Sequence, residues 1–173
     1  MEWIVGGLLI ATALVGGAVA IWRRQSNAVG WAITQLVLVA AAGILVLVGP
    51  APASGWSVPL AICAVLAATF GGGIVVKVVL RLAGHPQSIV DDLPASAWIG
   101  LVERFAMTFA LVLGRAEIAA VIIAVKALGT YRADGGTDGN RVASVRVLGT
   151  LTSVTWALLC YAVIVIARSR MVP

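Results

Sequence analysis

The sequence predicts an all-α fold, a polytopic bundle of about six transmembrane helices in one domain covering residues 1–173. Hydrophobic residues make up 61% of the chain and charged residues 11%, against about 45–50% and about 25% in soluble domains. The mean hydropathy is +1.07. A soluble fold of this size needs more polar surface than this composition supplies. The composition therefore excludes a disordered protein, a nucleic-acid-binding domain and an ordinary soluble enzyme.

Tryptophan placement is the second observation that predicts membrane helices. Five of the six tryptophans stand at the ends of apolar runs, where aromatic side chains anchor helices at the membrane–water interface. They are Trp3, Trp22, Trp31, Trp56 and Trp98. Trp156 lies inside the last run, so we expect it to pack against a neighbouring helix.

The apolar runs predict helices in six places. About 20 residues are needed to span a hydrocarbon core of about 30 Å. The first, second, third and last runs are long enough; the fourth requires that its charges be accommodated, and the fifth is short. The expected helices are 3–22, 31–48, 57–81, 97–113, 116–131 and 145–167.

The positive charges predict orientation rather than a nucleic-acid partner. The net charge is +5, and Lys and Arg are scattered at the ends of the apolar runs. Arg23 and Arg24 follow the first run, the reverse of a secretory signal peptide, so we expect a retained helix. With six crossings, the bias of Lys and Arg toward the cytoplasm predicts both termini outside. Arg168 and Arg170 are the exception, because this arrangement places them outside. If the fourth and fifth runs together crossed the membrane only once, the C-terminus and these two arginines would be inside.

Small residues at helical spacing predict close helix packing. Stripes of this kind let helix backbones approach one another in a membrane. The first run carries Ala13 and Gly17, and the third carries Ala64, Ala68 and Gly72.

Charges inside the fourth and fifth runs predict an intramembrane ion pair. Gly114 is the expected turn, with Glu103 11 positions before it and Lys126 12 positions after it. In an antiparallel hairpin these two residues lie at nearly the same depth, roughly 17 Å from the turn. A charge at the centre of a membrane helix costs about 2.5–3.5 kcal/mol, and pairing offsets part of that cost.

The last run supplies a small, polar face toward the same depth. Its residues follow the helical spacing i, i+3, i+4, i+7 and i+11, and they are Arg146, Gly149, Thr150, Ser153 and Ala157. We expect a polar cluster in the inner half of the bilayer that serves as a path or pocket for an anion or a phosphate headgroup. The alternative is a structural staple, a cluster that only fixes the register between the helices while its cations extend to the headgroups. The cluster comprises Glu103, Arg104, Lys126, Arg146, Thr150 and Ser153.

Other reactive side chains give no site. Cys63 and Cys160 lie inside apolar runs and are expected to be inert. His85 with Ser88, Asp91 and Asp92 lacks anything to position a triad. Asp134 and Asp138 lack the bidentate Glu of a calcium loop. We expect no metal and no cofactor.

Three motifs resemble the C-terminal part of an uncharacterised bacterial family of small polytopic membrane proteins, a domain of unknown function. They are WIGLVER at 98–104, AVK at 124–126 and LGTLTS at 148–153. The resemblance covers about 97–154, and an acidic residue typical of the stretch before the last motif is missing here. The resemblance implies no activity. It implies that the following residues form a recurring unit: Glu103, Arg104, Lys126, Gly149, Thr150 and Ser153.

These patterns favour a non-enzymatic protein of the bacterial cytoplasmic membrane. The first hypothesis is a small channel- or transport-like bundle, a homo-oligomer or one assembled with other membrane subunits. The second is an accessory or scaffold subunit in which the charges are only a staple. The expected surroundings are the lipid bilayer, with no nucleic acid. A lipid-modifying enzyme is disfavoured because no set of His, Asp, Glu and Ser converges on one membrane face.

Overall fold

The computed structural model describes residues 2–21, 27–84, 94–132 and 139–171 and contains six α-helices. This confirms the all-α bundle. A short 3-10 turn, η1 (Ser54–Trp56), precedes the third helix. The helices are α1 (Glu2–Ile21), α2 (Ala28–Val48), α3 (Ser57–Leu82), α5 (Pro94–Val112), α6 (Ala116–Arg132) and α7 (Gly139–Arg170).

Three helices extend beyond their expected bounds. α2 begins three residues early, α5 begins at Pro94, and α7 runs from Gly139 to Arg170 instead of 145–167. Apolarity marks the part of a helix inside the hydrocarbon, whereas the backbone hydrogen bonds continue into the headgroup layer. Proline suits the first turn of α5 because the amide hydrogen it lacks has no partner there.

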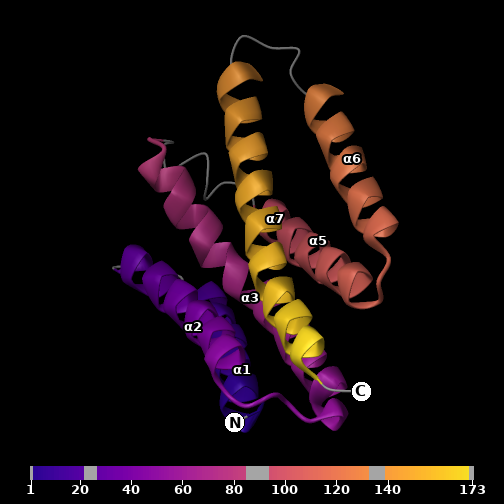
Figure 1. Cartoon of the computed structure of the whole chain (residues 1–173). Coiled ribbons are helices and arrows are strands. Elements are labelled where there is room, and N and C mark those ends of the chain that lie inside the picture. Colours follow the sequence, from indigo (N-terminus) through magenta and orange to yellow (C-terminus); the bar gives the residue numbers. More distant parts are fainter. Residues whose placement is uncertain (1, 22–26, 85–93, 133–138, 172–173) are drawn as a thin grey trace.

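The helices alternate in direction, and the two termini lie at the same end of the bundle (Figure 1). At that end Ala53 N–H donates to the Glu2 carboxylate at 2.9 Å. Arg170 donates to Leu47 O at 2.6 Å, and Arg168 donates to Val112 O at 3.2 Å. α5 and α6 form an antiparallel hairpin, so the chain leaves this hairpin at the end of the bundle where it enters it.

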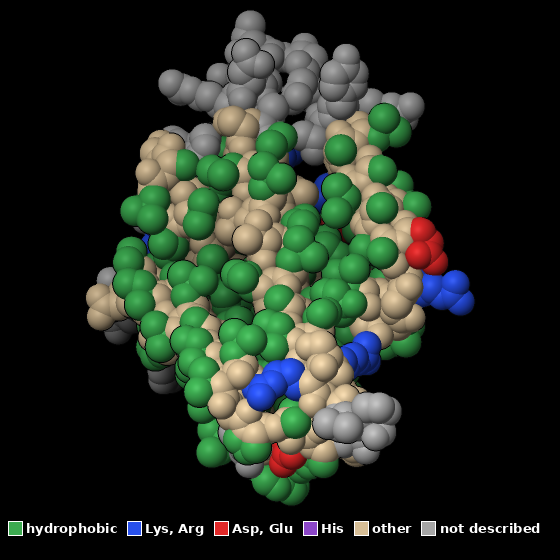
Figure 2. Space-filling view, in the orientation of Figure 1, with side chains coloured by type: hydrophobic (Ala, Val, Ile, Leu, Met, Phe, Trp, Pro, Cys, Tyr) green, Lys and Arg blue, Asp and Glu red, His purple; other side chains and the backbone are tan. Residues whose placement is uncertain are grey.

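Four helices are long and apolar enough to cross a membrane, with spans at Glu2–Ala20, Ala28–Val48, Ser57–Leu82 and Ser144–Arg170. The α5–α6 hairpin is shorter, and it carries charges within α5. Hydrophobic side chains cover most of the face shown in Figure 2. The chain is a multi-pass membrane protein.

α3 lies at the centre of the bundle and packs against α1, α2, α5 and α7, whereas α6 packs against α5 and α7. Small side chains permit this central position. Ala64 and Ala68 are fully buried, as the predicted stripe requires. A Cβ on Gly72 would come 2.7 Å from both Trp156 and Arg104, so this glycine provides space for two large side chains.

The backbones of α1 and α3 approach each other closely at Gly16. A Cβ there would overlap the Phe70 carbonyl and come 2.7 Å from Gly71 Cα. Gly17, the expected contact, has nothing within 4 Å of its would-be Cβ, so it makes no close contact with the described residues. Ala13 is buried, at 9% exposure. A Cβ on Gly149 would lie 3.7 and 4.0 Å from side-chain atoms of Val76 and Leu80 of α3, which are ordinary contact distances.

The described tryptophans divide as expected, and Trp22 lies outside the described residues. Trp3 and Trp98 are 75% and 70% exposed near helix ends. Trp3 also packs edge-on against Trp56, with ring centroids 4.3 Å apart. Trp156 is 1% exposed and donates from Nε1 to Ala67 O at 3.3 Å. The internal tryptophan therefore joins α7 to α3.

Candidate functional site

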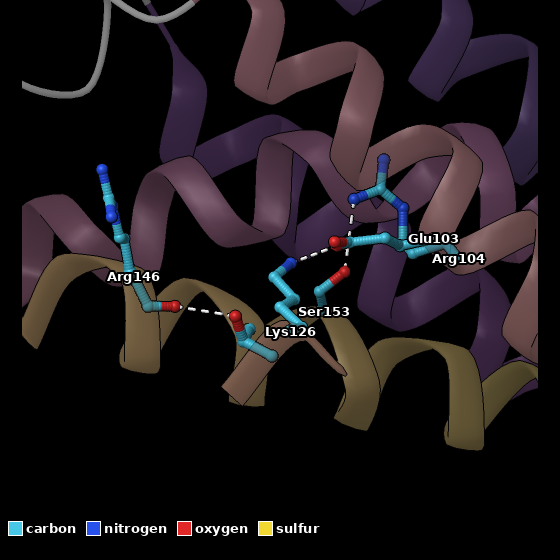
Figure 3. A network of polar contacts seen from close by, with 6 residues as sticks. Glu103, Arg104, Lys126, Arg146 and Ser153 are labelled. Carbon is cyan, nitrogen blue, oxygen red and sulfur yellow. Dashed lines mark hydrogen bonds and ion pairs between the residues drawn. The ribbon is translucent and has the colours of Figure 1, made fainter. Parts of the chain in front are cut away.

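An ion pair between Glu103 and Lys126 joins α5 to α6, as the sequence predicted (Figure 3). The turn that brings them together contains Gly114, which has a φ of +74°, and Arg115 N–H donates to Ala110 O at 2.9 Å. Glycine adopts this left-handed conformation without steric cost. The side chains of Glu103 and Lys126 are 18% and 27% exposed, so the pair is only partly shielded.

Arg104 points away from that pair and into the centre of the bundle. Its Nε and Nη2 donate to Thr69 O at 3.1 and 3.0 Å, and its Nη1 donates to Ser153 Oγ at 3.4 Å. The residue is 5% exposed. Its guanidinium therefore joins α5 to α3 and α7 without a carboxylate partner among the described residues.

Glycines make room for this guanidinium. The Arg104 side chain lies beside Gly72, and a Cβ on Gly100 would come 3.3 Å from its Nη1. Larger residues at these two positions would displace the side chain. The local sequence of α3 and α5 thus fits a large cation into a close-packed bundle.

The two hydroxyls predicted for the cluster have different roles. Ser153 is 4% exposed and accepts the hydrogen bond from Arg104. Thr150 donates to Arg146 O at 2.8 Å, a bond within its own helix. The hydroxyl hydrogen of Thr150 is therefore already used within α7 and is not available to a partner on another helix.

The side chain of Arg146 does not join the other five residues of the predicted cluster. This side chain is exposed, and it extends away from Lys126 and Glu103 in Figure 3. Arg146 lies one helical turn before Thr150, near the end of the bundle. A long cationic side chain at that depth reaches polar surroundings at little cost.

A narrow cleft between α5, α6 and α7 contains the ion pair. Its volume is about 10 Å³, which is roughly the least that a cavity needs to hold one water molecule. A larger solute can enter only if α6 moves relative to α5 and α7. The cleft is lined by Glu103, Met107, Ile122, Ile123, Lys126, Thr150, Ser153 and Val154.

Sequence reasoning missed the polar residues of α1, α2 and α3. Gln35 is fully buried, and its Nε2 donates to Thr12 O at 3.0 Å, while its Oε1 has no partner among the described residues. Thr12 and Thr69 donate to carbonyls of their own helices. A lone glutamine in an apolar membrane run indicates an interhelical hydrogen bond, and that signal was available in the sequence. Each of the six helices thus contributes a polar group to one layer of the bundle.

Arg168 and Arg170 have local partners that explain their position at the end of the bundle that holds the termini. Arg170 donates to Val46 O and Leu47 O, and Arg168 donates to Val112 O. These carbonyls belong to the last turns of α2 and α5, which lack intrahelical donors and carry partial negative charge. The two arginines therefore serve as helix caps.

The remaining candidates contribute little to the site. Cys160 is buried, Cys63 is half-buried, and both are free thiols. Arg115 and Glu117 form an exposed ion pair of 3.6 Å beside the α5–α6 turn. Within the ranges the structure describes, no three His, Cys, Asp or Glu side chains gather as metal ligands would. His85, Ser88, Asp91, Asp92, Asp134 and Asp138 lie outside the described residues.

Comparison of the chain with protein-family models, curated proteins and solved structures finds no match. The resemblance of residues 97–154 to an uncharacterised membrane family therefore stays a prediction.

Proposed function

We propose that this multi-pass protein is a non-enzymatic transport-type bundle of a bacterial cytoplasmic membrane, with a small-anion site in the cleft between α5, α6 and α7. One observation carries the proposal: the Glu103–Lys126 pair lies in a cleft, partly exposed, and not in the close-packed centre. Ionisable residues inside a membrane are expensive and commonly mark solute or ion paths.

The sign of the solute's charge follows from the charged side chains near the cleft. Lys126 and Glu103 line it, and Arg104 bonds to Ser153 at its inner wall. Two cations against one carboxylate leave an excess positive charge, which favours an anion. The Glu103 carboxylate already lies against Lys126, so an incoming anion would compete with it.

Access to the site depends on α6. Of its described side chains only Ala119 is buried, so α6 is weakly held by the rest of the chain. Movement of α6 about the Gly114 turn widens the cleft without disturbing Arg104. The exposed apolar side of α6 faces lipid or a second copy, and the proposal includes a homo-oligomer.

Flux into liposomes tests the proposal. Purified protein is reconstituted with an enclosed halide-sensitive dye, and entry of chloride and nitrate is compared with empty liposomes. The variant Glu103→Gln with Lys126→Met should reduce flux by about tenfold or more, as expected when ~1.4 kcal/mol of anion stabilisation is removed. The matched control is Arg115→Gln with Glu117→Gln, which removes the exposed pair and should leave flux unchanged. Wild-type flux equal to that of empty liposomes contradicts the proposal.

An accessory or scaffold subunit is the second candidate, and Arg104 favours it. That side chain is buried and bonded to Thr69 and Ser153, which is the arrangement expected of a staple. The mass of the complex extracted in mild detergent separates the two candidates. Integer multiples of the 17.7 kDa chain support a homo-oligomeric transporter, whereas a fixed ratio to an unlike chain supports a subunit.

A further inference from the structure

Three cations that form no ion pair with any described residue lie near the end of the bundle opposite the termini. Lys77 and Arg81 are half-buried on α3, and Arg146 is exposed on α7. Both ion pairs among the described residues involve other side chains, and Arg81 Nε is buried without a hydrogen-bond partner there. The C-terminal dipole of α3 attracts cations in its last turn, which accounts for Arg81 but not for Arg146.

The register between α3 and α7 brings these cations to similar depths. A Cβ on Gly72 would meet Trp156, and a Cβ on Gly149 would meet Val76 and Leu80, which sets the register of the two helices. The two helices are antiparallel, so Arg146, three residues before Gly149, lies level with Arg81. Lys77 lies one turn deeper, and the three Cα atoms fall within about 6 Å of depth.

The same cations border one region of the bundle. Lys77 and Arg81 stand one and two turns beyond Gly73, whose would-be Cβ lies 3.8 Å from Arg104 Nη2. Arg146 stands seven residues before Ser153, on the same face of α7, and Ser153 also contacts Arg104. The cations of α3 and the cation of α7 therefore both lie between Arg104 and the membrane interface.

We propose that Lys77, Arg81 and Arg146 bind the phosphate group of an anionic phospholipid in the cytoplasmic leaflet. Arginine guanidinium groups donate paired hydrogen bonds to phosphate oxygens. The depth is that of the headgroups, because the exposed Trp98 of α5 marks the same end. Cations clustered between helices on the cytoplasmic side are typical of sites for anionic headgroups. This site is separate from the cleft that contains Glu103 and Lys126, so it does not depend on the transport proposal.

Lipid retention measures this binding directly. The full-length protein is incorporated into nanodiscs with equal amounts of phosphatidylglycerol and phosphatidylcholine, released in the gas phase, and the lipids that remain bound are counted by native mass spectrometry. We expect wild-type protein to retain phosphatidylglycerol over phosphatidylcholine by about tenfold or more, given about fivefold per basic residue. The variant Lys77→Gln, Arg81→Gln, Arg146→Gln should retain the two lipids equally.

Controls separate this site from general surface charge and from misfolding. Arg115→Gln removes an exposed cation at the opposite end and should keep the preference. Arg146→Gln alone changes an exposed side chain, so it should fold normally and lose about fivefold of the preference. Equal retention by wild-type protein, or a full preference in the triple variant, overturns the proposal. Displacement of phosphatidylglycerol by millimolar inorganic phosphate overturns the lipid assignment in favour of a free phosphate ion.

Discussion

Arg104 donates two hydrogen bonds to a single main-chain oxygen, that of Thr69, from Nε at 3.1 Å and Nη2 at 3.0 Å. A helical carbonyl keeps a second lone pair for such a donor. The bond fixes α5 against the central helix, and the third nitrogen of the same group extends the link to Ser153 of α7. One side chain thus determines how three helices are arranged around the polar layer.

Replacing Arg104 by Lys should destabilise the protein although the charge is kept. An ammonium group cannot bond in a planar fork to Thr69 O and reach Ser153 as well. We expect a loss of about 1–3 kcal/mol, the range for a buried polar group left unsatisfied. Thermal unfolding in detergent measures the change, with Arg115→Lys as the exposed control. Unchanged thermal stability of Arg104→Lys would show that the fork is dispensable.

The Glu103–Lys126 pair predicts a specific pattern of double-mutant energies. Glu103→Gln leaves Lys126 without its carboxylate and should cost less than the about 3–5 kcal/mol of a fully buried pair, because both side chains are partly exposed. Adding Lys126→Met should recover much of that loss. Unfolding of the two single variants and the double variant gives the coupling energy. Strictly additive losses contradict direct pairing.

Adjacent glycines of α1 provide a matched test of helix packing. Gly16→Ala places a methyl group against the Phe70 carbonyl and Gly71, and should cost about 1–3 kcal/mol through overpacking. Gly17→Ala meets open space and should be neutral or slightly stabilising, because alanine favours helix by about 1 kcal/mol over glycine. The thermal stability of the two variants shows which glycine of α1 contacts α3. Equal effects would place the α1–α3 contact elsewhere.

Cysteine labelling tests how the bundle lies in the membrane. In a background lacking Cys63 and Cys160, we introduce single cysteines at Ala53, Ala83 and Ala116, all exposed. An impermeant maleimide added to intact cells should label positions 53 and 116, while position 83 should react only after the membrane is opened. This follows from the alternating helices and from the positive-inside rule. Labelling of 53 and 83 from one side rejects a full crossing by α3.

The sequence by itself determined the membrane class, the six helices and the pairing within the α5–α6 hairpin. Apolar runs record which segments leave water, because each backbone polar group in lipid must be satisfied within the helix. The Glu103–Lys126 pair was also predictable, since the Gly114 turn and the rise per residue fix the relative depth of two residues in a hairpin. Neither inference needs a contact between distant segments.

Only the tertiary structure decided how each helix is rotated about its axis. Lipid is as apolar as the helix core, so hydropathy does not mark the packed face of a membrane helix. For this reason the stripe on α1 was assigned to Gly17 and not Gly16, and Arg146 was grouped with side chains from which it turns away. Gln35 and the bond from Arg104 to Thr69 depend on that same rotation. The shapes of the surfaces that meet at α3 determine these contacts, and the linear pattern of apolar residues does not specify those shapes.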